Sequence, residues 1–262
     1  MPQVGIKYAG VNYTWDEARE ASADPSFPYP LALVEAMADQ RGDTQPSASS
    51  IVGCLRRFEL QRKMNYFDEA NGQLPPLFGT AWHSLMEMYT ERIKRAGDLI
   101  EKRLSKTFRF DRGNSAYSEV EFSGKLDFFR PGQFIMDWKS KRHIPQGFVP
   151  TQENTRQANI YNWLAAVNGY EAAPNVELVY VTQGWVQREV FRSTALDVVE
   201  GFVTRRLTRW VEAARSGSLP PPVPALFQQP DRYGKLPAPC GYCPVKEQCL
   251  AAIKADTDRP FE

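Results

Sequence analysis

Apolar and polar residues alternate with the period of a β-strand over residues 117–130 and again over residues 134–141. Both segments are rich in aromatic and β-branched residues, and a Pro-Gly turn signal separates them. This pattern predicts an antiparallel hairpin. The same signs predict a second hairpin over residues 176–182 and 185–191, around a Gln-Gly pair.

Other parts of the chain show helical spacing, or too little periodicity for either kind of element. Ser47 is placed to cap the first long helix, and a loop is expected over residues 71–76 because it ends in two prolines. Prolines also interrupt residues 1–46, where only a short helix over residues 31–39 is expected. Longer helices are predicted over residues 48–63, 79–95, 152–168 and 196–215, followed by an extended proline-rich stretch over residues 219–239.

Two acids and a lysine lie in the first hairpin, with Asp127 on one strand and Asp137 and Lys139 on the other. Asp137 and Lys139 are two residues apart, so they share one face of the sheet. Asp127 points to that face only if paired residue numbers sum to 264, and we predict this register or a bulge that has the same effect. Paired carboxylates beside a lysine suit a metal ion that activates water, although Asp-x-Lys is also common on solvated sheet faces.

Two pairs of polar residues lie four positions apart on predicted helices, so each pair shares one helix face. His83 and Glu87 form the first pair, and Gln157 and Tyr161 form the second. Taken alone, a histidine on a helix is more often structural than a metal ligand, and a Gln/Tyr pair is more often a surface feature. Their positions before and after the acidic hairpin are what favour a functional role.

The composition limits the partners and the location of such a site. The 32 Lys and Arg residues nearly balance 31 Asp and Glu residues, so nucleic-acid binding must come from local patches. No apolar run reaches the roughly 18 residues of a membrane span, and the N-terminus lacks a signal-peptide pattern. We therefore expect no membrane association and a cytoplasmic location, in a bacterium or in the host of a phage.

Four cysteines form a spaced group. Cys240, Cys243 and Cys249 are close in sequence, and Cys54 is the remaining thiol that completes four. Without a secretion signal, a metal site is favoured over a disulfide framework, because the cytosol keeps thiols reduced. Four thiolates suit either zinc or an iron-sulfur cluster, and the spacing does not choose between them.

In this order, the motifs resemble the RecB-like branch of the PD-(D/E)XK nucleases, in particular the CRISPR-associated RecB-like exonucleases and the nuclease domain of AddB-type proteins. The resemblance covers roughly residues 47–252 and implies an α/β fold with a restriction-endonuclease-like core, a mixed central sheet flanked by helices. It leaves residues 1–46 as an extension of unknown role and residues 253–262 as a tail. The matching segments are Gly79-Thr80-Ala81-Trp82-His83, Gly124-Lys125-Leu126-Asp127, Asp137-Trp138-Lys139-Ser140 and Gln157-Ala158-Asn159-Ile160-Tyr161.

This family resemblance implies metal-dependent hydrolysis of DNA phosphodiester bonds. Asp127 and Asp137 would bind the metal, with His83 and the backbone carbonyl of Trp138 as further ligands. Hard oxygen ligands suit Mg²⁺ or Mn²⁺, and the imidazole moves the preference somewhat towards Mn²⁺. The other residues that the resemblance places in catalysis are Lys139, beside the water, and Gln157 and Tyr161, which would position Lys139 or a phosphate.

Iron-sulfur members of this branch place one cysteine before the nuclease core, in a context like Cys54-Leu55-Arg56-Arg57-Phe58, and three after it. The resemblance therefore implies a 4Fe-4S cluster that joins the N- and C-terminal segments. The alternative is zinc held by the same four thiols. The implied ligands are Cys54, Cys240, Cys243 and Cys249.

The expected activity is that of an exonuclease, and its substrate is DNA with single-stranded or frayed ends. The expected setting is phage DNA processing and recombination, or CRISPR spacer acquisition. DNA contacts are expected from Arg56, Arg57, Lys141 and Arg142. The chain has no phosphate-loop motif, so a helicase or a CRISPR-integration partner would be a separate chain. Two alternatives stay open, a non-catalytic DNA-end-binding or scaffold subunit and a restriction-type endonuclease of the same superfamily.

Overall fold

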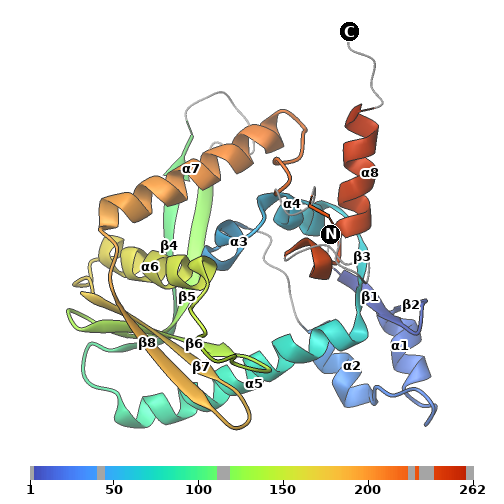
Figure 1. Ribbon diagram of the computed structural model, residues 1–262, viewed down its shortest axis with the longest axis horizontal. Coiled ribbons are helices and arrows are strands. Elements are labelled where there is room, and N and C mark those ends of the chain that lie inside the picture. The colour runs from blue at the N-terminus through green and yellow to red at the C-terminus, as the bar shows by residue number, and fades with distance from the viewer. Residues whose placement is uncertain (1–2, 40–44, 111–118, 224–227, 230–238, 258–262) are drawn as a thin grey trace. The chain divides into compact units, whose positions relative to one another are not determined.

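The computed structural model describes residues 3–39, 45–110, 119–223, 228–229 and 239–257. Residues 255–257 are described by their backbone alone. The chain forms two compact units (Figure 1). One, here called the sheet unit, comprises Gln45–Gly53 and Pro75–Arg215. The other, called the terminal unit, comprises Met1–Thr44, Cys54–Leu74 and Ser216–Glu262. The predicted domains 1–46, 47–252 and 253–262 were assigned by their expected functions, whereas these two units are defined by contacts within the fold. The functional assignment stays a prediction.

The sheet unit is built on a five-stranded mixed sheet in the order β4-β5-β6-β7-β8. Neighbouring strands are antiparallel except for β6 and β7, which run parallel. This arrangement confirms the predicted mixed sheet and both predicted hairpins. The strands are β4 (Leu99–Arg109), β5 (Glu119–Arg130), β6 (Phe134–Ser140), β7 (Asn175–Val181) and β8 (Val186–Arg192).

The predicted register of the first hairpin is also confirmed. Phe128 pairs with Met136 and Arg130 with Phe134, so the paired numbers sum to 264. Gly132 lies at the turn with a φ of +68°, a left-handed conformation that glycine adopts without a steric penalty. The pairing stops at Phe128, one step before Asp127 and Asp137, and the two strands separate at the position of these acids.

Strand β4 was not predicted from the sequence. It forms one edge of the sheet, with its residues exposed or half-buried except for Leu104, so its apolar and polar residues do not alternate clearly. Basic side chains such as Lys102 and Arg103 on its outer part are typical of an edge strand that must not pair with other chains. Its pairing with β5 has residue numbers summing to 228 and is interrupted at Glu101, between the pairs Ile100–Phe128 and Lys102–Leu126.

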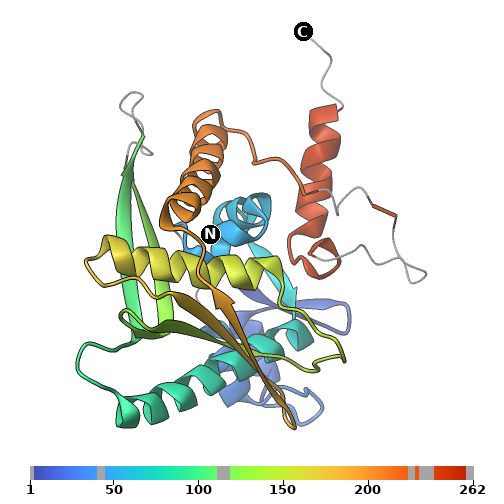
Figure 2. The same ribbon diagram turned by 60° about the vertical axis from the view of Figure 1, so that its left-hand side comes forward.

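Helices cover both faces of this sheet. The predicted helices α6 (Gln152–Val167) and α7 (Leu196–Arg215) are both present, and α6 packs along the strands and against α7. Helix α5 (Ala70–Ile93) lies on the other side of the strands from α6 (Figures 1 and 2). Thr151 caps α6 by accepting a hydrogen bond from the backbone of Asn154. Buried apolar residues of α6 form much of the core, including Ala158, Ile160, Trp163 and Leu164.

Two predicted boundaries were wrong. Residues 71–76 do not form a loop, because α5 already begins at Ala70 and includes Pro75 and Pro76. Proline fits helical φ angles, but inside a helix it removes one backbone hydrogen bond and its ring clashes with the preceding turn. The division between the two units falls at these prolines. The predicted helix over residues 48–63 is interrupted at Gly53, which separates α3 (Ala48–Val52) from α4 (Leu55–Lys63). Ser47 caps α3 as predicted.

The terminal unit holds a three-stranded sheet in the order β2-β1-β3, with β1 parallel to β3. The short helix predicted over residues 31–39 is confirmed, but the strands and the helix before it were missed. A small core of Leu60, Tyr66, Val245 and two cysteines joins α4 to α8. The elements of this unit are β1 (Gln3–Tyr8), β2 (Val11–Thr14), α1 (Trp15–Ala21), α2 (Leu31–Ala38), α4, β3 (Tyr66–Glu69), η2 (Cys240–Tyr242) and α8 (Lys246–Thr257). Among the helices described, none is both long and apolar enough to span a membrane.

Candidate functional site

Three carboxylates lie in a row across neighbouring strands of the sheet unit. Asp127 of β5 and Asp137 of β6 lie next to the last pair of their strands, Phe128 with Met136. Glu101 of β4 lies where the pairing of β4 with β5 is interrupted. His83 of α5 faces this row, with its Nδ1 atom 3.2 Å from Asp127 Oδ1 and 3.5 Å from Glu101 Oε1. Ligand atoms of His83, Glu101 and Asp127 all lie within 4.8 Å of one another, close enough to bind one ion.

Glu101 was not predicted as a site residue. Its side chain is 7% exposed and lies 2.5 Å from Lys125, and its φ of +46° is unusual for a residue that is not glycine. Such strained conformations are concentrated at functional sites. The edge strand that carries Glu101 gave no clear pattern in the sequence, so no signal linked this acid to the hairpin.

Two positively charged side chains, His83 and Lys125, neutralise part of the negative charge of these acids. Hydrogen bonds to Asp127 and then Glu101 raise the pKa of His83 to about 10, against the effect of burial. Burial raises the pKa of Glu101, but hydrogen bonds from His83 and Lys125 outweigh it, and the net effect is a pKa below the usual value. The carboxylates therefore surround a position where positive charge is strongly stabilised.

Asp137 is the most deeply buried acid of the row, at 1% exposed. Burial raises its pKa to about 6, although the neighbouring Lys139 opposes this shift. Lys139 Nζ lies 2.7 Å from Asp137 Oδ2, yet within the described chain no group donates a well-directed hydrogen bond to that oxygen. A buried carboxylate oxygen with a free lone pair is chemically suited to bind a cation.

Lys139 is fixed by a chain of hydrogen bonds from α6. Its ammonium donates to Gln157 Oε1 at 3.0 Å, and Gln157 Nε2 donates to the Tyr161 hydroxyl at 2.5 Å. The ring of Tyr161 packs on Gly124, where a Cβ atom would lie 2.8 Å from ring atom Cε1. This contact gives a physical reason for glycine at the start of the Gly-Lys-Leu-Asp segment.

The predicted residues of the acidic site are thus brought together in the sheet unit. A cleft of about 420 Å³ is lined by side chains of α5, of the sheet and of α6. Trp138 lies beside Asp127 and donates its backbone N–H to Asp127 Oδ2 at 2.6 Å, while the ligand role of its carbonyl stays a prediction. The charged and polar residues that line the cleft include His83, Glu87, Glu101, Lys125, Asp127, Asp137, Lys139, Gln157 and Tyr161.

A family model described as the PD-(D/E)XK nuclease superfamily matches residues 100–250, more than half of the chain. The chain belongs to the PD-(D/E)XK nuclease superfamily. No curated protein sequence matches it significantly. A solved structure titled "Crystal structure of SSO0001" is similar in 83% of this chain and 92% of its own, at 14% identity and a TM-score of 0.48.

Nucleases of the PD-(D/E)XK superfamily use divalent metal ions, and the acidic site has the donor set for one. It offers three carboxylates and an imidazole, including the buried Asp137 oxygen that lacks a directed donor. Oxygen donors with one nitrogen suit Mg²⁺ or Mn²⁺ rather than a thiophilic metal. The residues present therefore fit the metal that the superfamily requires.

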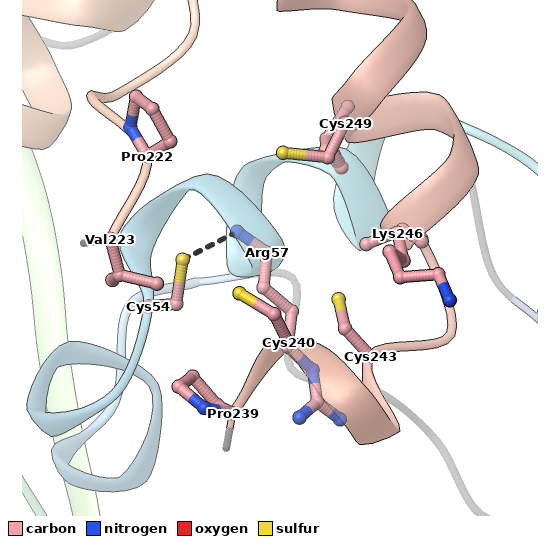
Figure 3. A pocket seen from close by; sticks show the side chains of 11 residues that line it. Cys54, Arg57, Pro222, Val223, Pro239, Cys240, Cys243, Lys246 and Cys249 are labelled. Carbon is pink, nitrogen blue, oxygen red and sulfur yellow. Dashed lines mark hydrogen bonds between the residues drawn. The ribbon is translucent and has the colours of Figure 1, made fainter. Parts of the chain in front are cut away.

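The second candidate centre of this nuclease lies in the terminal unit. Cys54 at the start of α4, Cys240 and Cys243 around η2, and Cys249 of α8 all line one small cavity. Figure 3 shows their sulfur atoms pointing towards the same space, and none of the four forms a disulfide. The predicted group of four thiols is thus assembled.

Spacing between the thiols is wider than a single zinc ion needs. No three of their Sγ atoms lie within 4.8 Å of one another, although all four cysteines belong to the described residues. Tetrahedral zinc with bonds of about 2.3 Å holds its sulfur ligands only about 3.8 Å apart. The cavity that the four cysteines line measures about 20 Å³.

The four basic residues predicted to bind DNA lie in different surroundings. Arg56 is 3% exposed and donates from Nε to Cys249 Sγ, so its burial contradicts the predicted DNA contact. Arg57 is half-buried at the edge of the cysteine cavity. Lys141 lies 4.7 Å above the ring of Phe148, and Arg142 is exposed. Contacts of the last three residues with DNA stay a prediction.

Proposed function

We propose that this protein is a metal-dependent DNA exonuclease that acts on single-stranded or frayed ends and belongs to the RecB-like iron-sulfur branch of its superfamily. The observation that carries the proposal is the row of three carboxylates that faces His83 in an open cleft, with Lys139 beside Asp137. The preference for DNA ends rests on the resemblance of the four sequence motifs to that branch.

His83, Glu101, Asp127 and Asp137 would hold the metal ion. When bound, Mg²⁺ or Mn²⁺ would lower the pKa of a water molecule and offset negative charge on the phosphate. Asp127 is oriented for this role by the backbone N–H of Trp138, which engages one oxygen and leaves the other directed at His83. The cleft, at about 420 Å³, is large enough to admit part of a nucleotide strand.

Lys139 is the group best placed to orient a water molecule or to stabilise charge on the phosphate. Burial lowers the pKa of Lys139, but the ion pair with Asp137 outweighs it and raises the pKa above its usual value, so the side chain is a cation at neutral pH. Gln157 Oε1 accepts a hydrogen bond from one of the three N–H groups of Lys139 and so fixes the direction of the other two. Tyr161 holds the Gln157 amide, which makes both residues positioning groups.

The four cysteines would hold a 4Fe-4S cluster. The choice of a cluster over zinc rests on the resemblance of Cys54-Leu55-Arg56-Arg57-Phe58 to the iron-sulfur members of that branch. Four thiolates leave a cluster no open position for hydrolysis. The cluster would therefore stabilise the terminal unit rather than cut DNA. Zinc held by the same four thiols is the alternative.

The biological setting follows from the same resemblance. We place the enzyme in the cytoplasm of a bacterium or of a phage-infected cell, in phage DNA processing and recombination or in CRISPR spacer acquisition. A helicase or an integration complex would be a separate protein. Arg57, Lys141 and Arg142 remain the proposed DNA contacts.

The decisive experiment incubates end-labelled single-stranded DNA with the anaerobically purified protein and Mn²⁺ or Mg²⁺, beside closed circular single-stranded DNA. We expect the labelled strand to shorten, the circle to stay intact, and Asp137→Asn to lose about 100-fold or more of the rate. Asp197→Asn, an exposed acid at the start of α7, is the matched control and should cut normally.

Each outcome separates one function from another. A wild-type protein that binds the ends but leaves them intact is a scaffold subunit and not an enzyme. Cleavage of the closed circle indicates an endonuclease. Equal rates for wild type and Asp137→Asn place the chemistry elsewhere and refute the proposed site.

A further inference from the structure

Arg56 is a buried cation without a carboxylate partner. Its side chain lies on α4 at 3% exposure, and within the described chain no acid lies within the 4.0 Å of an ion pair. Glu59, one turn along the same helix and fully buried, is paired instead with Arg62 and Lys63. A buried charge that lacks an opposite charge is strongly unfavourable, so a source of negative charge is expected beside Arg56.

The hydrogen bonds of Arg56 point to that source. Nε donates to Cys249 Sγ at 3.2 Å, and Nη1 donates to the backbone carbonyl of Pro220 at 3.3 Å. The other terminal nitrogen, Nη2, is buried and has no hydrogen-bond partner within the described chain. Arg56 is not among the residues that line the cysteine cavity, so its guanidinium contacts the Cys249 sulfur from outside the cavity.

A metal centre in this cavity would supply the missing charge. Four thiolates carry more negative charge than a zinc ion or a 4Fe-4S core offsets, so either centre is anionic. Apolar side chains line much of the cavity, including Leu60, Val223 and Val245, and the cations that line it are Arg57 and Lys246. Arg56 differs from both because it is buried and donates a hydrogen bond to a cysteine sulfur. An N–H···S bond from a buried guanidinium is the kind of outer contact that tunes a metal-thiolate centre.

We propose that Arg56 is the counter-charge of the cysteine centre, a positioning residue that orients Cys249 as a ligand and stabilises the bound metal or cluster. This inference rests on the proposed function, because it requires a metal centre at the four cysteines. It also explains why two adjacent arginines differ, since residues one apart on a helix point about 100° away from each other. Arg57 turns its guanidinium towards Gln61.

The test compares Arg56→Met, which removes the charge at similar length, with Arg56→Lys, which keeps it. Lys63→Met removes a cation from the same helix, and Glu59 keeps its bonds to Arg62, so this variant is the control. Iron, sulfide and zinc are measured in each protein after anaerobic purification. The rate of metal loss to a chelator is then followed, with the far-UV spectrum recorded as a check on folding.

We expect Arg56→Met to lose its metal roughly 10–100-fold faster than wild type, which is the usual effect of removing an outer-shell partner. Arg56→Lys should recover most of this loss, and Lys63→Met should match wild type. If the centre is a cluster, removing a positive charge disfavours the added electron. The reduction equilibrium of Arg56→Met should then shift about tenfold towards the oxidised form, or ~59 mV for one electron.

The failures are distinguishable. A wild-type protein without metal at the cysteines refutes the proposed centre and the role of Arg56 together. A metal-loaded wild type and an Arg56→Met protein with the same retention refute the role of Arg56 alone. If Arg56→Met does not fold, Arg56→Gln replaces it as the uncharged variant, and wild-type retention there refutes the charge. A lysine variant as defective as the uncharged one shows that shape and not charge matters.

Discussion

Gly124 is predicted to be irreplaceable even by alanine, because a Cβ atom there would overlap a side chain that positions Lys139. That atom would lie 2.8 and 2.9 Å from two ring carbons of Tyr161 and 2.9 Å from Leu164 Cδ1. Ordinary carbon contacts are about 3.5–4.0 Å, so the ring must move by roughly 0.6–1 Å. Neither neighbour is a flexible chain end, since Tyr161 is 6% and Leu164 1% exposed.

The displacement should reach the active site through two hydrogen bonds. Tyr161 holds the Gln157 amide, and Gln157 accepts from Lys139, so a shift of the ring loosens the ammonium beside Asp137. Overpacking of this kind costs about 1–3 kcal/mol of unfolding free energy. A misplacement of about 1 Å in a catalytic group reduces rates by about 100-fold.

Urea denaturation and the rate of DNA cleavage by Gly124→Ala measure the two effects separately. Gly201→Ala is the control, because its Cβ atom would meet only the mobile end of Arg205 at 3.2 Å, and alanine favours a helix interior. We expect the control to keep its stability and rate. Wild-type stability and wild-type cleavage in Gly124→Ala would show that Tyr161 does not depend on this contact.

Three further predictions follow from single contacts. Tyr161→Phe removes the acceptor of the Gln157 amide, and we expect a roughly tenfold lower cleavage rate with little change in the urea midpoint. Glu101→Gln should weaken Mn²⁺ binding about 10–100-fold in calorimetry, and unaltered affinity would remove Glu101 from the ligand set. Asp98→Asn breaks a two-pronged bond with Arg130 and should lower the unfolding free energy by about 1.5–3 kcal/mol at pH 7. Arg130 lowers the pKa of Asp98, so this contribution is present above the usual aspartate pKa and lost in acid; a wild-type minus variant difference that stays constant down to pH 2 contradicts it.

The sequence predicted those parts of the fold in which local pattern and tertiary packing agree. Both hairpins, α6 and α7 combine a clear period with a glycine or a turn at their ends, and the structure confirms them. The break at Gly53 could not be predicted from the period, because the helical pattern continues on both sides of it. There Cys54 leaves the helix and accepts a hydrogen bond from the backbone of Arg57 as the cap of α4.

Surface and buried roles of charged residues were harder to tell apart. Arg56 and Arg57 are adjacent and identical in type, and together they resemble a basic patch for DNA. Only the packing of α4 against α8 shows that the first is buried against Cys249 while the second remains half-exposed. Burial of a charge depends on which helix face meets a partner, and that information lies in a segment about 190 residues further along the chain.

Glu101 shows what would have been needed to complete the acidic site. In an antiparallel sheet, a residue and the one opposite it point to the same face, so a ligand on one strand identifies a position on each neighbour. The acids of β5 and β6 were found as parts of the Gly-Lys-Leu-Asp and Asp-x-Lys motifs, and the register was chosen so that both carboxylates share one face. The link between β4 and β5 is longer and gives no register, and β4 is an edge strand with a weak pattern. The pairing of β4 with β5 is also interrupted at Glu101, whose φ is +46°. The place of Glu101 at the site therefore follows from tertiary contacts with His83 and Lys125, which local pairing does not specify.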